Sequence, residues 1–111
     1  MSFYHILRLQ YDILISMSIQ SIQQSALPIF QKYDIRKASL FGSVLRGEDT
    51  EKSDIDVLVD MPKKMSLLDV VAFQLDLEDA LGKSVDVVEY DLIKPSLQSN
   101  ILNNQKQIYP V

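Results

Sequence analysis

The chain of 111 residues contains no cysteine and a single histidine, His5. Without cysteine, the protein cannot form a disulfide bond or a zinc site built on thiolates. One histidine cannot by itself form a histidine metal site. Any metal bound by this protein must therefore be held mainly by oxygen ligands.

The sequence also lacks a run of basic residues. Its 11 lysines and arginines and 15 aspartates and glutamates give a net charge of 11 − 15 = −4. An acidic chain of this kind attracts the phosphate backbone of long nucleic acids poorly. We predict no direct nucleic-acid binding, and an anionic ligand would need local help, such as a metal ion.

The first twenty residues are rather apolar but do not have the pattern of a signal peptide or a membrane span. Arg8 and Asp12 interrupt the run, and there is neither a positive amino-terminal region nor a small-residue cleavage site. We therefore predict no membrane contact and a cytoplasmic location. Residues 1–16 are interpreted as a helical or weakly ordered extension, and residues 17–111 as one small domain, which leaves no room for a second, substrate-binding domain.

The hydrophobic pattern predicts an α+β (mixed α/β) domain. Ser66 and Asp69 form a capping box for a helix that should end before Gly82. Pro28 should kink or restart the first helix, and Pro95 fits the first turn of the last one. The expected elements are helices at 18–33, 66–81 and 95–105 and strands at 36–41, 55–60 and 84–90. This order suggests a small three-stranded mixed sheet packed with about four helices, the amino-terminal extension included.

Three acidic residues stand at the starts of two predicted strands. Asp54 precedes the strand 55–60, Asp56 is its second residue, and Asp86 lies near the start of the strand 84–90. Asp54 and Asp56 are two residues apart, so their side chains leave the same face of the strand. Three converging carboxylates would repel each other unless a cation were present. Carboxylate ligands alone favour Mg²⁺ or Mn²⁺, which usually work together with phosphates.

A glycine and a serine, Gly42 and Ser43, follow the strand 36–41, and ten residues separate them from Asp54. A glycine after a strand lets the backbone approach a phosphate closely. The Ser43 hydroxyl and the following backbone N–H groups could donate to phosphate oxygens, and Arg46 could add positive charge. One strand end would then hold the phosphates of a nucleotide, and the neighbouring strand ends the metal.

Each of these patterns also has a simpler interpretation. An Asp-x-Asp after a loop is commonly a solvated turn or a cap, and Gly-Ser after a strand is usually just a turn. Asp60 could replace one of the three ligands, but it stands at the far end of its strand and is taken as a strand terminator. Glu89 and Asp91 are expected to face water or to cap the last helix. The combination of patterns at this spacing favours a functional site.

The combined motif resembles the signature of the DNA polymerase beta-like nucleotidyltransferase superfamily. The stretch LFGSVLRGEDTEKSDIDVLVD, followed by a helix and KSVDVVEYDLIKPSLQSNIL, is similar to the minimal nucleotidyltransferases, the MNT family. The resemblance covers about residues 18–110. It implies that Asp54, Asp56 and Asp86 hold two Mg²⁺ ions, that Asp86 helps to activate an acceptor hydroxyl, and that Gly42 and Ser43, with Arg46, bind the phosphates of ATP.

The same resemblance implies a partner. MNT proteins are typically encoded beside HEPN-domain RNases, as the antitoxin and toxin of a two-gene system, and transfer AMP from ATP to a tyrosine hydroxyl of the toxin. The leading hypothesis is therefore a protein adenylyltransferase antitoxin that forms a hetero-oligomer with its HEPN toxin. Two alternatives stay open: an antitoxin that masks its partner without chemistry, and a small-molecule nucleotidyltransferase completed by a partner subunit.

Overall fold

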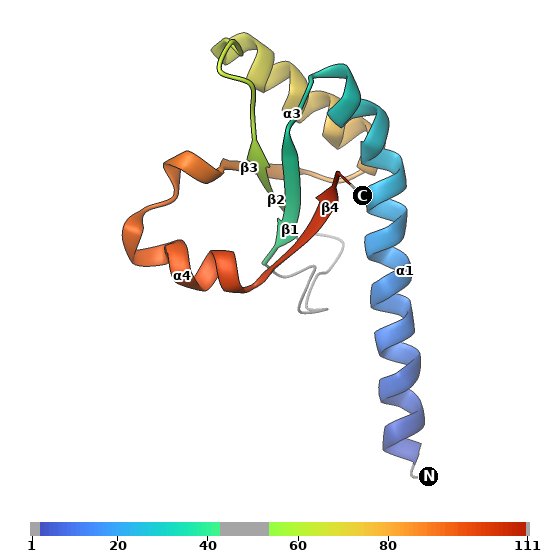
Figure 1. Cartoon of the computed structure of the whole chain (residues 1–111). Helices are drawn as coiled ribbons and strands as arrows, with labels where there is room; N and C mark the ends of the chain where they lie inside the picture. The colour runs from blue at the N-terminus through green and yellow to red at the C-terminus, as the bar shows by residue number, and fades with distance from the viewer. Residues whose placement is uncertain (1–2, 43–53, 111) are drawn as a thin grey trace.

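The computed structural model describes residues 3–42 and 54–110, and Figure 1 shows their arrangement. Within these residues the chain forms three α-helices, a short 3-10 helix and four strands. The helices are α1 (Phe3–Lys32), α3 (Leu67–Leu81) and α4 (Pro95–Asn103), with the 3-10 helix η1 (Tyr90–Leu92) before α4. The strands are β1 (Lys37–Phe41), β2 (Ile55–Asp60), β3 (Val85–Glu89) and β4 (Gln105–Tyr109).

The four strands form one mixed sheet in the order β3-β2-β1-β4. Strand β1 is antiparallel to both β2 and β4, and β2 is parallel to β3. The predicted α+β class is confirmed, but the predicted count of three strands is wrong. The hydrophobic pattern does not indicate strand β4, because its first three residues, Gln105 to Gln107, are polar. A short, charged edge strand needs no alternating apolar pattern.

One face of the sheet is covered by α1 and α3 and carries the hydrophobic core (Figure 1). Alternate residues of a strand point to opposite faces, so Ile55, Val57 and Val59 of β2 all enter this core. Phe30 from α1 and Phe73 from α3 meet above them, with ring centroids 6.2 Å apart. We call this the helical face of the sheet, and the other its open face.

Helix α3 begins and ends as its sequence predicts. Ser66 is the N-cap, its hydroxyl accepts from the Asp69 backbone N–H at 3.2 Å, and the Asp69 carboxylate accepts from the Ser66 N–H at 3.0 Å. Gly82 adopts a left-handed conformation with φ of 68° at the other end. The predicted capping box and the terminating glycine are both confirmed.

Helix α1 is continuous from Phe3 to Lys32, so Pro28 does not restart it. Figure 1 shows the last turns of α1 leaning away from the axis of the earlier turns, as expected where a proline removes a helical hydrogen bond. The described side chains that join the core from α1 begin at Ile19. A boundary between an extension and a domain after residue 16 remains a prediction, since α1 passes through it. No helix in the described ranges is long and apolar enough to span a membrane.

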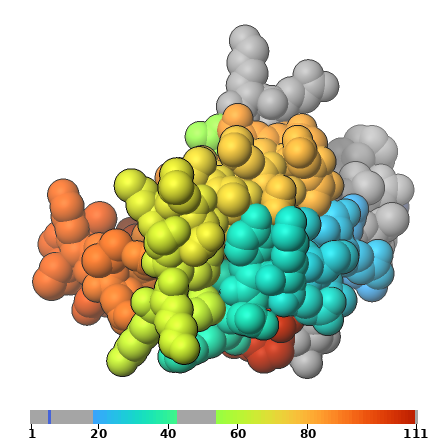
Figure 2. Space-filling model, turned by 90° about the horizontal axis from the view of Figure 1, so that it is seen from above, coloured from blue at the N-terminus to red at the C-terminus, as the bar shows by residue number. Residues whose placement is uncertain are grey.

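The segment from η1 through α4 leads the chain from β3, at one edge of the sheet, to β4 at the other. Helix α4 begins with Pro95 at its first turn, as predicted, but ends at Asn103 instead of residue 105. None of its nine described residues is buried. In Figure 2 the orange residues of this segment form a lobe at one side of the molecule.

Candidate active site

One row of cross-strand neighbours runs across the entire sheet, close to where β1 ends and where β2 and β3 begin. Its members, in spatial order from β4 to β3, are Gln105, Phe41, Asp56 and Asp86. Paired residues of neighbouring strands project from the same face. Because the adjacent residues Ile55 and Val85 point into the helical-face core, this row lies on the open face. We call it the acidic row.

The acidic row brings together two of the acids singled out from the sequence. Asp56 and Asp86 are 30 positions apart in the chain, yet they are direct partners in the parallel β2–β3 pair. Asp54 stands immediately before β2, at the same end of the sheet. The Ile55 backbone N–H donates to the Ser84 carbonyl at 2.9 Å and so ties the starts of the two strands together. Asp54 and Asp86 are exposed and Asp56 is half-buried, so a ligand can reach this edge from solvent.

Gly42 ends β1 directly beside Asp56. Its φ of +77° lies in the left-handed region, which favours glycine. A Cβ added at Gly42 would overlap an oxygen of the Asp56 carboxylate and come within 3.2 Å of its Cγ. Two separate constraints therefore favour glycine here, and the second shows that the Gly42 backbone lies against the carboxylate of Asp56.

The chemistry of these donors agrees with a hard divalent cation, which binds carboxylate oxygens. Asp56 and Asp86 are paired, and Asp54 is two residues from Asp56. In the part of the chain that the structure describes, however, no three acidic, histidine or cysteine side chains are arranged so that they could hold a metal ion together. The donor set fits Mg²⁺ in kind, and the metal role of the three aspartates remains a prediction.

Two further residues predicted from the sequence lie outside the described residues. Ser43 and Arg46 belong to the stretch 43–53, so their phosphate-binding roles also remain predictions. Gly42 is the member of the proposed phosphate-binding group that can be placed.

Residues 24–110 match the family model described as "Polymerase beta, Nucleotidyltransferase". This stretch contains the whole sheet, the glycine turn and all three aspartates. The chain belongs to this nucleotidyltransferase family.

Named relatives agree with the family. A protein of Methanocaldococcus jannaschii named "Putative protein adenylyltransferase MJ0435" is 46% identical over 87 residues, which is 78% of this chain and 94% of that protein. The protein adenylyltransferase MntA of Thermococcus cleftensis is 36% identical over 72 residues, covering 65% of this chain and 73% of that protein.

Solved structures share the fold. One described as a "putative minimal nucleotidyltransferase" is 31% identical and has a TM-score of 0.70, covering 81% of this chain and 92% of that one. A toxin-antitoxin complex with AMP-PNP has a TM-score of 0.69 at 21% identity, covering 80% and 73%. A complex of a tri-AMPylated HEPN toxin of Shewanella oneidensis with an MNT antitoxin has a TM-score of 0.64 at 19% identity, covering 84% and 73%.

A polar network on the open face of this nucleotidyltransferase was not predicted from the sequence. The Ser39 hydroxyl lies 2.8 Å from the Tyr90 hydroxyl, and Tyr90 donates to Oε1 of Gln105 at 2.8 Å. The one available signal is a lone serine among the apolar residues of β1, KASLF. The residues that meet it come from η1 and from strand β4, so their proximity was not visible in the sequence.

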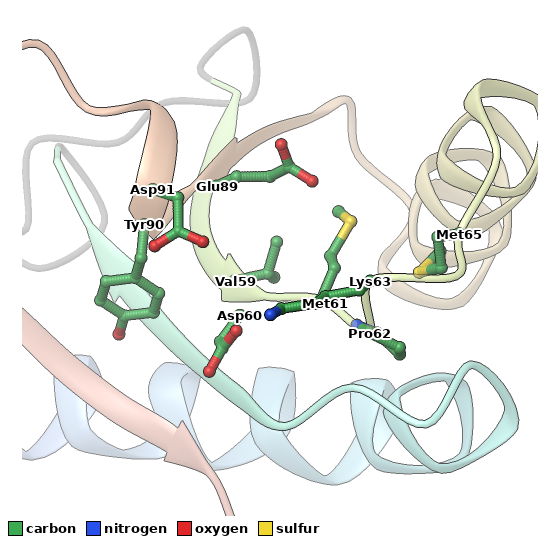
Figure 3. A pocket seen from close by; sticks show the side chains of 9 residues that line it. All are labelled: Val59, Asp60, Met61, Pro62, Lys63, Met65, Glu89, Tyr90 and Asp91. Atoms are coloured by element: carbon green, nitrogen blue, oxygen red, sulfur yellow. The ribbon is translucent and has the colours of Figure 1, made fainter.

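A hollow of about 170 Å³ lies at the opposite end of β2 and β3 from the acidic row (Figure 3). Its lining includes Asp60, Met61, Glu89 and Asp91, at or just beyond the carboxyl ends of the two strands. The hollow therefore does not contain the acids predicted to be catalytic. Asp91 does not cap α4, since the N-cap of that helix is Lys94 and it has no side-chain cap.

Proposed function

We propose that this chain is a metal-dependent protein adenylyltransferase that transfers AMP from ATP to a tyrosine hydroxyl of a cognate HEPN-domain toxin and so acts as its antitoxin. The names of the relatives and the toxin-antitoxin complexes among the solved neighbours support this assignment.

The observation that carries the proposal is the contact between Gly42, at the end of β1, and the acidic row. Gly42 lies against the carboxylate of Asp56, which is paired with Asp86 across the β2–β3 ladder. A phosphate held at the backbone after Gly42 would therefore be adjacent to two carboxylates. This is the juxtaposition that transfer of a nucleotidyl group needs, because its catalysis depends on positioning and on neutralising phosphate charge.

In the proposed reaction, an oxygen of the acceptor hydroxyl attacks the α-phosphorus of ATP. The new bond joins this oxygen to phosphorus, and the bond from the α-phosphorus to the oxygen bridging to the β-phosphate breaks, so that pyrophosphate leaves. The Asp86 carboxylate accepts the proton of the hydroxyl. Bound divalent cations, held by Asp54, Asp56 and Asp86, would neutralise negative charge on the phosphates.

The exposure of the site favours an acceptor carried by a protein. Asp54 and Asp86 are open to solvent, so a hydroxyl on the surface of another protein can approach them. The hollow of Figure 3 lies at the other end of the sheet. This placement supports a protein acceptor over the small-molecule alternative.

The test is to incubate the purified protein with Mg²⁺, ATP and the protein encoded beside it, and to weigh the partner by intact mass spectrometry. We expect the partner to gain one or more AMP residues. The double variant Asp54→Asn with Asp56→Asn should abolish the gain. A matched control, Asp60→Asn with Asp91→Asn, removes the same charge at the other end of the sheet and should preserve it.

Two results would contradict the proposal. Neutralisation of the partner without any change of mass, unaffected by Asp54→Asn with Asp56→Asn, would establish an antitoxin that acts by binding alone. AMP found on a small molecule and never on the partner would establish the small-molecule alternative.

A further inference from the structure

The polar network on the open face has no part in the reaction proposed above. Ser39 is completely buried in the centre of β1, with an exposed fraction of 0%. A buried hydroxyl costs free energy unless it is hydrogen-bonded. Strand β1 could accommodate an alanine at this position, as it does at Ala38, so the structure needs a separate reason for a serine.

The hydrogen bonds of this network have a defined direction. Tyr90 has one hydroxyl proton, and it donates this proton to Oε1 of Gln105. Ser39 must therefore donate to the Tyr90 oxygen, 2.8 Å away. The side-chain amide of Gln105 donates in turn to the Leu102 carbonyl at 3.1 Å, in the last turn of α4. Hydrogen bonds in such a chain strengthen one another, so the loss of one member weakens the rest.

The network fastens the segment from η1 to α4 onto the open face. Tyr90 follows β3 at one edge of the sheet, yet its hydroxyl reaches β1 and β4 at the other side. Figure 3 shows the Tyr90 ring, which also lines the hollow, lying beside β1. The ammonium of Lys37 lies 5.1 Å from the centre of the Tyr90 ring and stabilises this orientation. No residue of α4 is buried, but Ile93, between η1 and α4, is. The polar contacts therefore act together with the Ile93 side chain to attach the segment.

The network also borders the acidic row. Ser39 precedes Phe41 by two residues on the same face of β1, a step of about 7 Å along a strand. Gln105 is itself a member of the row, paired with Phe41. Both polar ends of its side chain are used, by Tyr90 and by the Leu102 carbonyl. One N–H donor and one acceptor site of the Gln105 side chain are therefore engaged in holding the segment.

We propose that Tyr90 is a positioning residue for the nucleotide: held between Ser39 and Gln105, it fixes the η1–α4 segment as a wall of the ATP site beside Gly42. This inference rests on the proposed function. The network attaches to β1 and β4, the half of the row where Gly42 would bind phosphates, whereas Asp86, which would receive the acceptor hydroxyl, lies on β3. Loss of the wall should therefore weaken the binding of ATP more than that of the acceptor.

The experiment compares Tyr90→Phe with Tyr33→Phe, because each removes one hydrogen-bonded tyrosine hydroxyl. Tyr33 donates to Asp76 at 2.6 Å on the helical face, far from the row. For Tyr90→Phe we expect the KM for ATP, and the Kd for Mg²⁺–AMP-PNP measured by calorimetry, to rise by roughly 3- to 10-fold, the range expected for one hydrogen bond. The kcat and the KM for the partner protein should change by less than about twofold.

For Tyr33→Phe we expect a similar loss of thermal stability but no change in the KM for ATP. Ser39→Ala is a second variant that interrupts the same network without removing a ring, and it should raise the KM for ATP in the same direction. Combining it with Tyr90→Phe should raise the KM no further than the stronger single variant does, because both act through one chain of bonds.

Equal effects of Tyr90→Phe and Tyr33→Phe on ATP binding would overturn the positioning role while the proposed function stood. So would a rise in the KM for the partner protein with the KM for ATP unchanged. A wild-type protein that neither binds Mg²⁺–AMP-PNP nor transfers AMP would instead overturn the proposed function and, with it, this inference.

Discussion

The two faces of the sheet are built from the same strands, but the polar residues of the sheet's centre and of the predicted site lie on only one of them. On the helical face, Ala38, Leu40 and Val57 are almost completely buried beneath α1 and α3. On the open face, the alternate positions of the same strands carry Ser39, Asp56 and Asp86, together with the buried Leu58 that pairs with Ser39. Because successive side chains of a strand point to opposite faces, a strand of six residues can contribute to both the core and the predicted site.

The helical face mainly stabilises the protein, whereas the acidic row carries the residues that its proposed chemistry requires. The helical face contributes buried apolar area, the dominant favourable free energy of folding. The open face carries carboxylates that contribute no such area and, being alike in charge, favour a bound cation or phosphate partner. Substitutions on the helical face should therefore reduce stability, and substitutions in the acidic row should reduce activity without unfolding the protein.

The largest expected effect belongs to the helical face. Phe73 is completely buried against Phe30 and Tyr33. Phe73→Ala should lower the free energy of unfolding by about 3–5 kcal/mol, because it leaves a cavity in the core. In a domain with a total stability of about 5–15 kcal/mol, this is a large share. Urea denaturation followed by circular dichroism measures the change.

The control for this variant is Leu68→Ala in the same helix. Leu68 is 80% exposed, so its truncation should change stability by no more than about 0.5 kcal/mol. Equal losses for the two variants would refute the assignment of the helical face as the core.

The next effect contrasts the two faces within one strand. Asp86 points to the open face, whereas Glu89, paired with Val59, points to the other. If Asp86 is the general base, Asp86→Asn should lower the rate of AMP transfer by about 100- to 10,000-fold. Glu89→Gln makes the same chemical change three residues away and should leave the rate within about twofold. Both rates follow from radiolabelled AMP incorporated into the partner, and thermal unfolding of each variant checks that its fold is intact.

The smallest effect concerns an ion pair on the helical side. A hydrogen bond from Tyr33, and then one from Lys32, lower the pKa of Asp76 below its usual value of 3.8. A depressed carboxyl pKa stabilises the folded state above the unfolded value and ceases to do so as the pH falls through the folded value. The stability advantage of the wild type over Asp76→Asn should therefore be present at neutral pH and shrink below pH 3.8.

Urea midpoints at neutral pH and at about pH 2.5 measure this difference. Tyr33→Phe removes the larger cause of the shift and should lose most of the same pH-dependent advantage. An advantage that stays constant from neutral to acid pH would show that the ion pair does not contribute through the charge of Asp76.

Much of the fold was predictable because its signals are local. The alternation in IDVLVD and the capping box at Ser66 specify a strand and a helix start from neighbouring residues alone. Strand β4 was not predictable in this way, since Gln105 to Gln107 carry no apolar pattern. Its strand conformation depends on pairing with β1, a contact between segments more than 60 residues apart.

The residues of the candidate site also fall into two groups, those that local sequence signals identify and those that only the fold brings together. Asp54, Asp56, Asp86 and Gly42 could be chosen from spacing and residue type, since they stand at strand boundaries that the hydrophobic pattern marks. Tyr90 and Gln105 could not be chosen, because neither stands in a recognisable motif. They are brought together with Ser39 by the crossing of the η1–α4 segment over the sheet.

The sequence by itself determined the kinds of residue available for chemistry, the two strands that begin with acids, and the glycine that ends the strand before them. Only the tertiary structure decided the register that pairs Asp56 with Asp86 and places Gly42 against the Asp56 carboxylate. It alone decided that β4 completes the row with Gln105. The physical reason is that local pattern specifies conformation, whereas register and cross-strand neighbours follow from burying one face of the whole sheet under α1 and α3.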